Sequence, residues 1–143
     1  MADILHDLPI HAPAERVYAA FTAPAGLDEW WTARSAGHPE LGTEYRLFFE
    51  PHYDWRAVVT MANPDRAFEL RMAQSDPDWE GTCIGVRLEP QGTATMVRFY
   101  HTGWHEANEH FRVSSCCWAM YLRILRRWLE QGERVPYPER LDA

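Results

Sequence analysis

Residues 106–131, EANEHFRVSSCCWAMYLRILRRWLEQ, form the longest helical pattern in the chain. One apolar stripe recurs at helical spacing and consists of Phe111, Trp118, Leu122, Leu125 and Leu129. An adjoining stripe consists of Ser114, Cys117, Tyr121, Ile124 and Trp128. Gly132 and Pro136 predict where the helix ends. With a rise of about 1.5 Å per residue, this helix is about 40 Å long and able to cross a whole small sheet.

Between residues 44 and 101, upstream of this helix, the hydrophobic period is two, which is typical of strands. The alternating segments are 45–49, 54–61, 67–73, 82–89 and 93–101. Turn residues separate them, for example Asn63-Pro64-Asp65 and Pro90-Gln91-Gly92. Consecutive strands with short connections predict an antiparallel meander.

The N-terminal part predicts one more strand and two short helices. Residues 3–10 alternate, Pro13 begins a helix that stops at Pro24, and residues 26–31 form a second short turn of helix. Because the first strand can pair only with the far side of the meander, the sheet must curl around the last helix. We therefore predict one α+β domain over residues 1–143, with a curved antiparallel sheet of about six strands wrapped around the C-terminal helix.

The composition restricts the partners and the compartment. The formal net charge of −7 repels phosphate backbones and anionic lipid surfaces, so we do not expect nucleic acid as a partner. No apolar run approaches the ~20 residues that span a bilayer, so membrane insertion is not expected. Cys83, Cys116 and Cys117 show no CxxC spacing, and reduced thiols in a cytoplasmic protein are the simplest interpretation.

Residues 8–31, LPIHAPAERVYAAFTAPAGLDEWW, resemble the opening of the SRPBCC superfamily, also called START-like or Bet v 1-like. More narrowly, they resemble the branch similar to the C-terminal domain of the activator of the Hsp90 ATPase. Residues 88–93 resemble the last hairpin of that branch, residues 101–103 its step into the last helix, and residues 118–132 the helix itself. The resemblance covers nearly the whole chain.

This resemblance implies a helix-grip fold, in which a curved sheet encloses the long helix. Members of the superfamily bind lipids, sterols, polyketides or hormones, assist chaperones, or catalyse cyclisations, so the fold does not fix the activity. The family usually carries glycine just before the helix tryptophan, whereas this chain has Cys117 there. We expect this larger side chain to narrow the floor of a cavity or to tilt the helix.

The parity of the strands predicts which side chains face the helix across an apolar interior. The residues expected to line a ligand cavity are Trp31, Tyr45, Val59, Phe68, Leu70, Val86, Phe99, His101, Phe111, Ser114, Trp118 and Tyr121. The alternative is that these side chains only pack on one another. Trp30, Trp31 and Trp104 either cap the cavity, form an exposed patch for a protein partner, or cover the ends of the sheet.

His101 is the main polar candidate. An inward imidazole there either binds a ligand, acts as a general base, or is a hydrogen-bonded core histidine. His105 and His110 follow it, but they diverge by roughly 140° around a helix axis and fit no zinc pattern. We therefore expect no metal and no other cofactor. No nucleophile, carboxylate pair or phosphate loop stands out, so we assign no catalytic residue and regard an enzyme as uncertain.

Three functions follow from these observations. The first is a binding domain for an apolar or lipid-like small molecule, held between the sheet and the C-terminal helix. The second, implied by the resemblance, is a co-chaperone or stress-related interaction protein with a chaperone partner. The third is a cyclase- or hydrolase-like enzyme that uses His101 as its base. A homodimer is compatible with all three.

Overall fold

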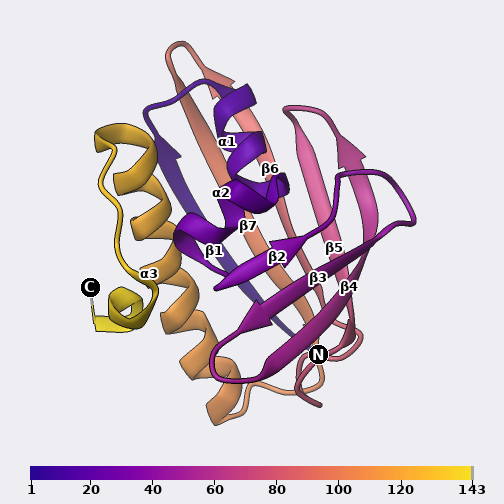
Figure 1. Cartoon of the computed structure of the whole chain (residues 1–143). Helices are drawn as coiled ribbons and strands as arrows, with labels where there is room; N and C mark the ends of the chain where they lie inside the picture. Colours follow the sequence, from indigo (N-terminus) through magenta and orange to yellow (C-terminus); the bar gives the residue numbers. More distant parts are fainter. Residues whose placement is uncertain (143) are drawn as a thin grey trace.

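A computed structural model describes residues 1–142 and shows an antiparallel sheet curving around one long helix (Figure 1). The helices are α1 (Ala14–Thr22), α2 (Pro24–Trp30), α3 (Glu109–Gln131) and the short 3-10 helix η1 (Tyr137–Asp142). The strands are β1 (Ala2–Ile10), β2 (Arg34–Ala36), β3 (Glu44–Phe49), β4 (Tyr53–Asn63), β5 (Ala67–Gln74), β6 (Cys83–Gln91) and β7 (Ala94–Trp104). The predicted α+β helix-grip architecture is confirmed.

The sheet has seven strands in the order β1-β7-β6-β5-β4-β3-β2. The first strand pairs with the last, with Ile4 opposite His101 and Leu8 opposite Val97, as the sequence predicts. The strand beyond the expected six is β2, which pairs with β3 through Ser35 and Leu47. Because β2 is only three residues long, it shows no hydrophobic alternation that the sequence would reveal.

Helix α3 begins at Glu109, so the predicted start at residue 106 is wrong by one turn. Two features explain the difference. Strand β7 continues to Trp104, and the Asn108 side chain caps the helix by accepting a hydrogen bond from the Phe111 N–H at 2.9 Å. At the other end Gly132 adopts a left-handed conformation with φ 70°, which favours glycine.

The core lies between the concave face of the sheet and the buried stripe of α3. Alternate strand residues face α3, and the buried ones include Tyr45, Leu47, Val59, Phe68, Leu70, Val86 and Phe99. A register shift in β4 between Val59 and Met61 bends the sheet around the helix. Helices α1 and α2 pack beside α3, and α1 also contacts β5, β6 and β7 (Figure 1).

In the part of the chain that the structure describes, no helix combines the length and the apolar character that crossing a bilayer requires.

The C-terminal segment folds back against α3 and is fastened by one buried arginine (Figure 1). The Arg140 guanidinium donates hydrogen bonds to the carbonyl oxygens of Val135, Thr32 and Asp28 at 3.2, 3.2 and 2.6 Å. Two of these acceptors lie just before and just after the end of α2, so Arg140 ties η1 to the end of α2. Burial lowers the pKa of Arg140, and the three carbonyl contacts compensate for part of the desolvation.

We expect Arg140→Met to lower the free energy of unfolding by about 1–3 kcal/mol, because three buried carbonyl groups lose their donor. Urea denaturation measures this change. Arg134→Met is the matched control: its side chain is 71% exposed and forms only a surface ion pair with Glu29, so its effect should stay within about 0.5 kcal/mol. Equal losses in the two variants would contradict the role given to Arg140.

Candidate functional site

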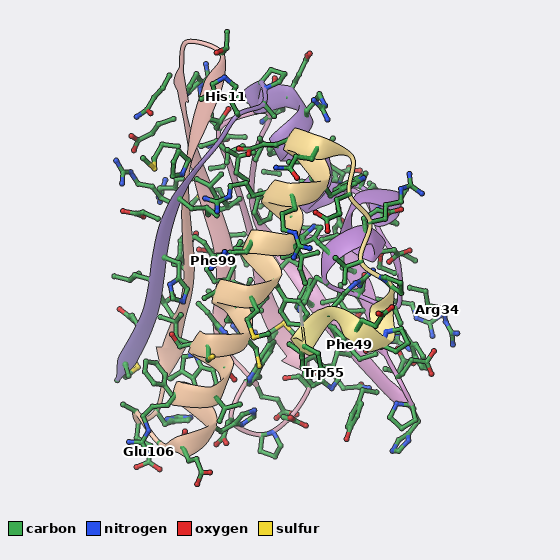
Figure 2. All side chains as sticks on the ribbon, turned by 90° about the vertical axis from the view of Figure 1, so that its left-hand side faces the viewer. His11, Arg34, Phe49, Trp55, Phe99 and Glu106 are labelled. Carbon is green, nitrogen blue, oxygen red and sulfur yellow. The ribbon has the colours of Figure 1, made fainter. Side chains whose placement is uncertain are left out.

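A hollow of about 260 Å³ opens between the N-terminal half of α3 and the adjoining ends of β3 and β4. The loop between β5 and β6 and the start of η1 complete its wall. Figure 2 shows Phe49 and Trp55, two of its lining residues, beside the C-terminal segment and α3. Because aromatic rings make up most of its wall, we call it the aromatic hollow.

Three buried tryptophans form the floor: Trp31, Trp79 and Trp118. They come from the end of α2, the β5–β6 loop and the middle of α3. The Trp118 ring lies 5.1 Å from the Trp31 ring and 5.9 Å from the Trp79 ring, measured between centroids. These are contact distances for aromatic pairs, so the floor is a continuous apolar surface.

The walls carry five further aromatic residues: Phe49, Tyr53, Trp55, Tyr121 and Tyr137. Trp55 bridges wall and floor, since its ring centroid lies 5.0 Å from that of Phe49 and 4.9 Å from that of Trp79. Tyr53 is 45% exposed, so the hollow is open to solvent at this edge. Burial raises the pKa of Tyr121 to about 12, which keeps its hydroxyl neutral and able to donate a hydrogen bond.

The remaining lining residues are Glu50, Asp76, His110, Val113, Ser114 and Cys117. His110 Nδ1 lies 2.9 Å from the Asp78 carboxylate, and its Nε2 lies 4.0 Å from that of Asp76. The Ser114 hydroxyl accepts a hydrogen bond from Trp79 Nε1 at 3.4 Å. His110, Ser114 and Asp76 therefore place polar groups along one side of α3 and the loop that faces it, and Glu50 adds a carboxylate from the end of β3.

Cys117 lies on this wall at the position where the resembled family usually has glycine. Burial and the neighbouring Cys116 raise the pKa of the Cys117 thiol, so it is less ionised than an ordinary cysteine. A protonated thiol is a weak nucleophile. Cys117 therefore acts as a small apolar wall residue, and its size helps to set the volume of the hollow.

The deeper interior, between the sheet and the rest of α3, is almost filled. A void of only about 20 Å³ remains there, which is room for about one water molecule. The Trp118 ring separates this void from the aromatic hollow. Its centroid lies 4.6 Å from the centroid of the Phe99 ring. Open space thus lies near the surface, and side chains fill the centre.

The twelve residues predicted to line a cavity fall into three groups. Those that line the aromatic hollow are Trp31, Ser114, Trp118 and Tyr121. Those that surround only the small void are Phe68, Leu70, Val86 and Phe99. Those that line neither space are Tyr45, Val59, His101 and Phe111.

Each residue of the third group has another role in the packing. The Tyr45 hydroxyl donates a hydrogen bond to the Thr22 carbonyl at 2.6 Å, and Val59 is part of the core. Phe111 packs with its ring 5.4 Å from that of Trp104. The idea that Trp30, Trp31 and Trp104 form an exposed patch is wrong, because all three are buried.

His101 is fully buried and both of its ring nitrogens are occupied. Trp118 Nε1 donates to His101 Nδ1 at 3.1 Å, so Nε2 carries the proton of the neutral ring and bonds to Thr82 Oγ1 at 2.7 Å. The Thr82 hydroxyl in turn donates to the Trp79 carbonyl at 2.5 Å. Burial, with a smaller contribution from His110, lowers the pKa of His101 from 6.5 to about 3.

The sequence predicted only Trp31, Ser114, Trp118 and Tyr121 among the residues that line the aromatic hollow, although the residue pattern indicates some of the others. Trp55 has the same strand parity as Val59, which the sequence predicts to face the interior. His110 and Ser114 are four residues apart and so share a face of α3. Five further lining residues lie where no period operates: Glu50, Tyr53, Asp76, Trp79 and Tyr137 are at strand ends, in loops or beyond α3.

Within residues 1–142, no group of three or more histidine, cysteine, aspartate or glutamate residues is arranged to hold a metal ion. The polar side chains around the hollow are suited to hydrogen bonding and charge recognition.

Several solved structures are similar to this chain over most of its length. The solution structure of the Aha1 dimer from Colwellia psychrerythraea is 32% identical, with a TM-score of 0.84, over 93% of this chain and 99% of that chain. Protein SSP2350 from Staphylococcus saprophyticus is 18% identical, with a TM-score of 0.80, over 94% and 96%. Protein MLL2253 from Mesorhizobium loti is 18% identical, with a TM-score of 0.81, over 92% and 99%. The last two show the fold alone.

No protein with a curated description matches the chain significantly. The family model described as "Activator of Hsp90 ATPase homolog 1-like protein" matches residues 11–130, a span from the end of β1 nearly to the end of α3. With that match and the 32% identical relative, the chain belongs to the activator of Hsp90 ATPase homolog 1-like family, within the SRPBCC superfamily.

Proposed function

We propose that this protein binds a compact, mainly apolar small molecule in the aromatic hollow. The observation that carries the proposal is an open space of about 260 Å³ whose floor and walls are aromatic. Ligand sites are usually concave and apolar, with a few polar groups that fix the orientation. Ser114, His110 and the Tyr121 hydroxyl are such groups here.

The size of the hollow limits the ligand. Small-molecule sites typically enclose about 300–1,000 Å³, so a volume of about 260 Å³ lies just below this range. The void behind Trp118 adds only about 20 Å³. A single ring with short substituents suits this space, and a sterol or a long acyl chain does not. Binding would be driven by burial of apolar surface, at about 25 cal/mol per Å² before ordering costs.

Binding fits the site better than catalysis by His101. A general base needs a free lone pair within reach of the substrate. The His101 Nδ1 lone pair accepts the Trp118 N–H, and its ring has no exposed surface. The lowered pKa of about 3 makes the imidazole a weak base. We therefore assign His101 to the support of Trp118 and not to chemistry.

Membership of the family supports a second function, an interaction with a chaperone. The 32% identical relative from Colwellia psychrerythraea is an Aha1 dimer, so a homodimer of this chain is part of the same proposal. This role and small-molecule binding are compatible, since the aromatic hollow occupies only one end of α3.

Filling the hollow tests the first function. We expect single-ring aromatic compounds to quench tryptophan fluorescence saturably and to raise Tm in the wild type, because Trp79 and Trp118 form the floor. Cys117→Phe should weaken this binding at least tenfold by occupying the space. Cys116→Phe is the matched control, because Cys116 is the exposed neighbour, and it should bind like the wild type.

An unchanged Tm of the wild type across the whole panel would refute small-molecule binding. Equal affinities of Cys117→Phe and the wild type would place any binding elsewhere. If Cys117→Phe loses its cooperative unfolding, Cys117→Leu offers a smaller filling side chain with the same expected direction.

The assignment of His101 makes a prediction for pH. Between pH 6.5 and about 3 the unfolded chain binds a proton at this residue and the native state does not. The free energy of unfolding therefore falls as the pH drops below 6.5, by up to about 1.4 kcal/mol for each pH unit from this group.

Urea denaturation at several pH values measures the slope for the wild type, for His101→Gln and for the control His105→Gln, which changes an exposed histidine. His101→Gln should be less stable near neutral pH by about 1–3 kcal/mol, because it cannot keep both hydrogen bonds, and its slope should be shallower. His105→Gln should keep the slope of the wild type. A steep slope retained in His101→Gln would show that other groups cause it.

The chaperone function predicts that the purified chain raises the ATP hydrolysis rate of an Hsp90-type chaperone from the same host. The rate is measured with and without an excess of the chain, and size-exclusion chromatography reports the oligomeric state. An unchanged rate together with no complex would exclude this function.

A further inference from the structure

The charged residues around the aromatic hollow are of one sign. Its wall carries the carboxylates of Glu50 and Asp76, from the end of β3 and from the β5–β6 loop. Asp78 lies next to the wall through its contact with His110. No arginine is among the lining residues within the described chain, and the protein contains no lysine. The hollow is therefore acidic as well as aromatic.

In the described part of the chain, few positively charged groups lie close to the carboxylates of Glu50 and Asp76. Among residues 1–142, Glu50 forms no ion pair, and Asp76 has only the His110 ring at 4.0 Å. The Tyr137 hydroxyl accepts a hydrogen bond from the Glu50 N–H at 3.0 Å, so the backbone that carries this carboxylate is held in place. The Asp76 carbonyl accepts hydrogen bonds from the N–H groups of Trp79 and Glu80, which fixes the second carboxylate in its loop.

The arginine side chain beside Tyr137, Arg140, binds backbone carbonyl groups and not the carboxylates of the hollow. The guanidinium carbon of Arg140 lies 5.3 Å from the centre of the Tyr137 ring, which lines the hollow. The nitrogens of Arg140 bond to three backbone carbonyls, and this side chain does not line the hollow. Within residues 1–142, no arginine forms an ion pair with Glu50 or Asp76.

Aromatic rings add a second attraction for positive charge. The face of a tryptophan or tyrosine ring attracts a cation through its quadrupole, most strongly where water is excluded, and aromatic cages are the usual sites for quaternary ammonium groups. The floor of three buried tryptophans provides such an environment next to Glu50 and Asp76. An anionic ligand such as a fatty acid would be repelled by the same carboxylates.

We infer that the ligand of the aromatic hollow is a small organic ammonium ion. Its apolar substituents lie against Trp31, Trp79 and Trp118, and its positive nitrogen is attracted by the wall carboxylates Glu50 and Asp76. This inference rests on the proposed small-molecule function and specifies the class of ligand.

Three compounds of nearly the same shape test the sign of the charge: benzyltrimethylammonium, neopentylbenzene as its neutral isostere, and benzylsulfonate as an anion. Tryptophan fluorescence titration of the full chain gives each Kd. We expect the cation to bind at least tenfold more tightly than the neutral isostere, and the anion to bind more weakly than both. Added salt should weaken the binding of the cation and leave that of the neutral compound unchanged.

Charge-removing variants test the location. Glu50→Gln and Asp76→Asn should each weaken the binding of the cation several-fold and leave that of the neutral isostere unchanged. Glu80→Gln is the matched control, because it removes one exposed carboxylate from the same loop as Asp76 without touching the hollow. It should bind the cation like the wild type.

The outcomes separate the two proposals. If the neutral isostere binds as tightly as the cation, or more tightly, the inference fails and the small-molecule function stands. If Glu80→Gln weakens the binding of the cation as much as Glu50→Gln does, the effect comes from net charge and the inference fails. If none of the three compounds binds, the proposed function fails and this inference fails with it.

Discussion

The position of the Trp118 ring determines which part of the interior is filled by side chains and which part is left as open volume. This side chain projects from the middle of α3 into the concave sheet, and its ring contacts Trp31, Trp79 and Phe99. Its N–H is bonded to His101, which fixes the orientation of the ring as well as its depth. A ring held from several sides cannot move aside for a ligand without breaking buried contacts, so the space behind it stays closed. The open volume therefore lies in front of it.

The hydrogen bonds beneath Trp118 make this arrangement specific. The series runs from Trp118 through His101 and Thr82 to the Trp79 carbonyl. It links α3, β7 and the β5–β6 loop, so it joins the helix to the sheet and also positions a second tryptophan of the floor. A buried imidazole that is fully hydrogen-bonded costs little, whereas the same imidazole without partners would be strongly destabilising. Because His101, near the end of β7, needs a partner for each ring nitrogen, it holds Trp118 in place and does not line the aromatic hollow.

Much of the fold was predictable from two hydrophobic periods. Spacing near 3.6 residues predicted a helix over residues 106–131, where α3 spans Glu109–Gln131, and spacing of two predicted the alternation that buries Phe68, Leu70 and Val86. The site was less accessible to the same reasoning. Period and parity tell which side chains point inward, but they do not tell whether two facing side chains touch or leave a gap. That depends on how rings such as Trp31 and Phe99 fill the remaining space, which is a property of the packed structure.

Four residues of the aromatic hollow come from places that the fold leaves free to vary. Glu50, Asp76, Trp79 and Tyr137 lie at the end of a strand, in a loop, and beyond α3, where no buried stripe constrains the residue type. In contrast, the floor residue Trp118 belongs to the central stripe of α3 and serves both stability and the site. A family can then keep the stripe and the sheet while it changes the charge and the width of the hollow through these edges and through the position of Cys117. In this chain those edges carry Glu50 and Asp76, so the acidic charge of the hollow comes from positions outside the buried framework of the fold.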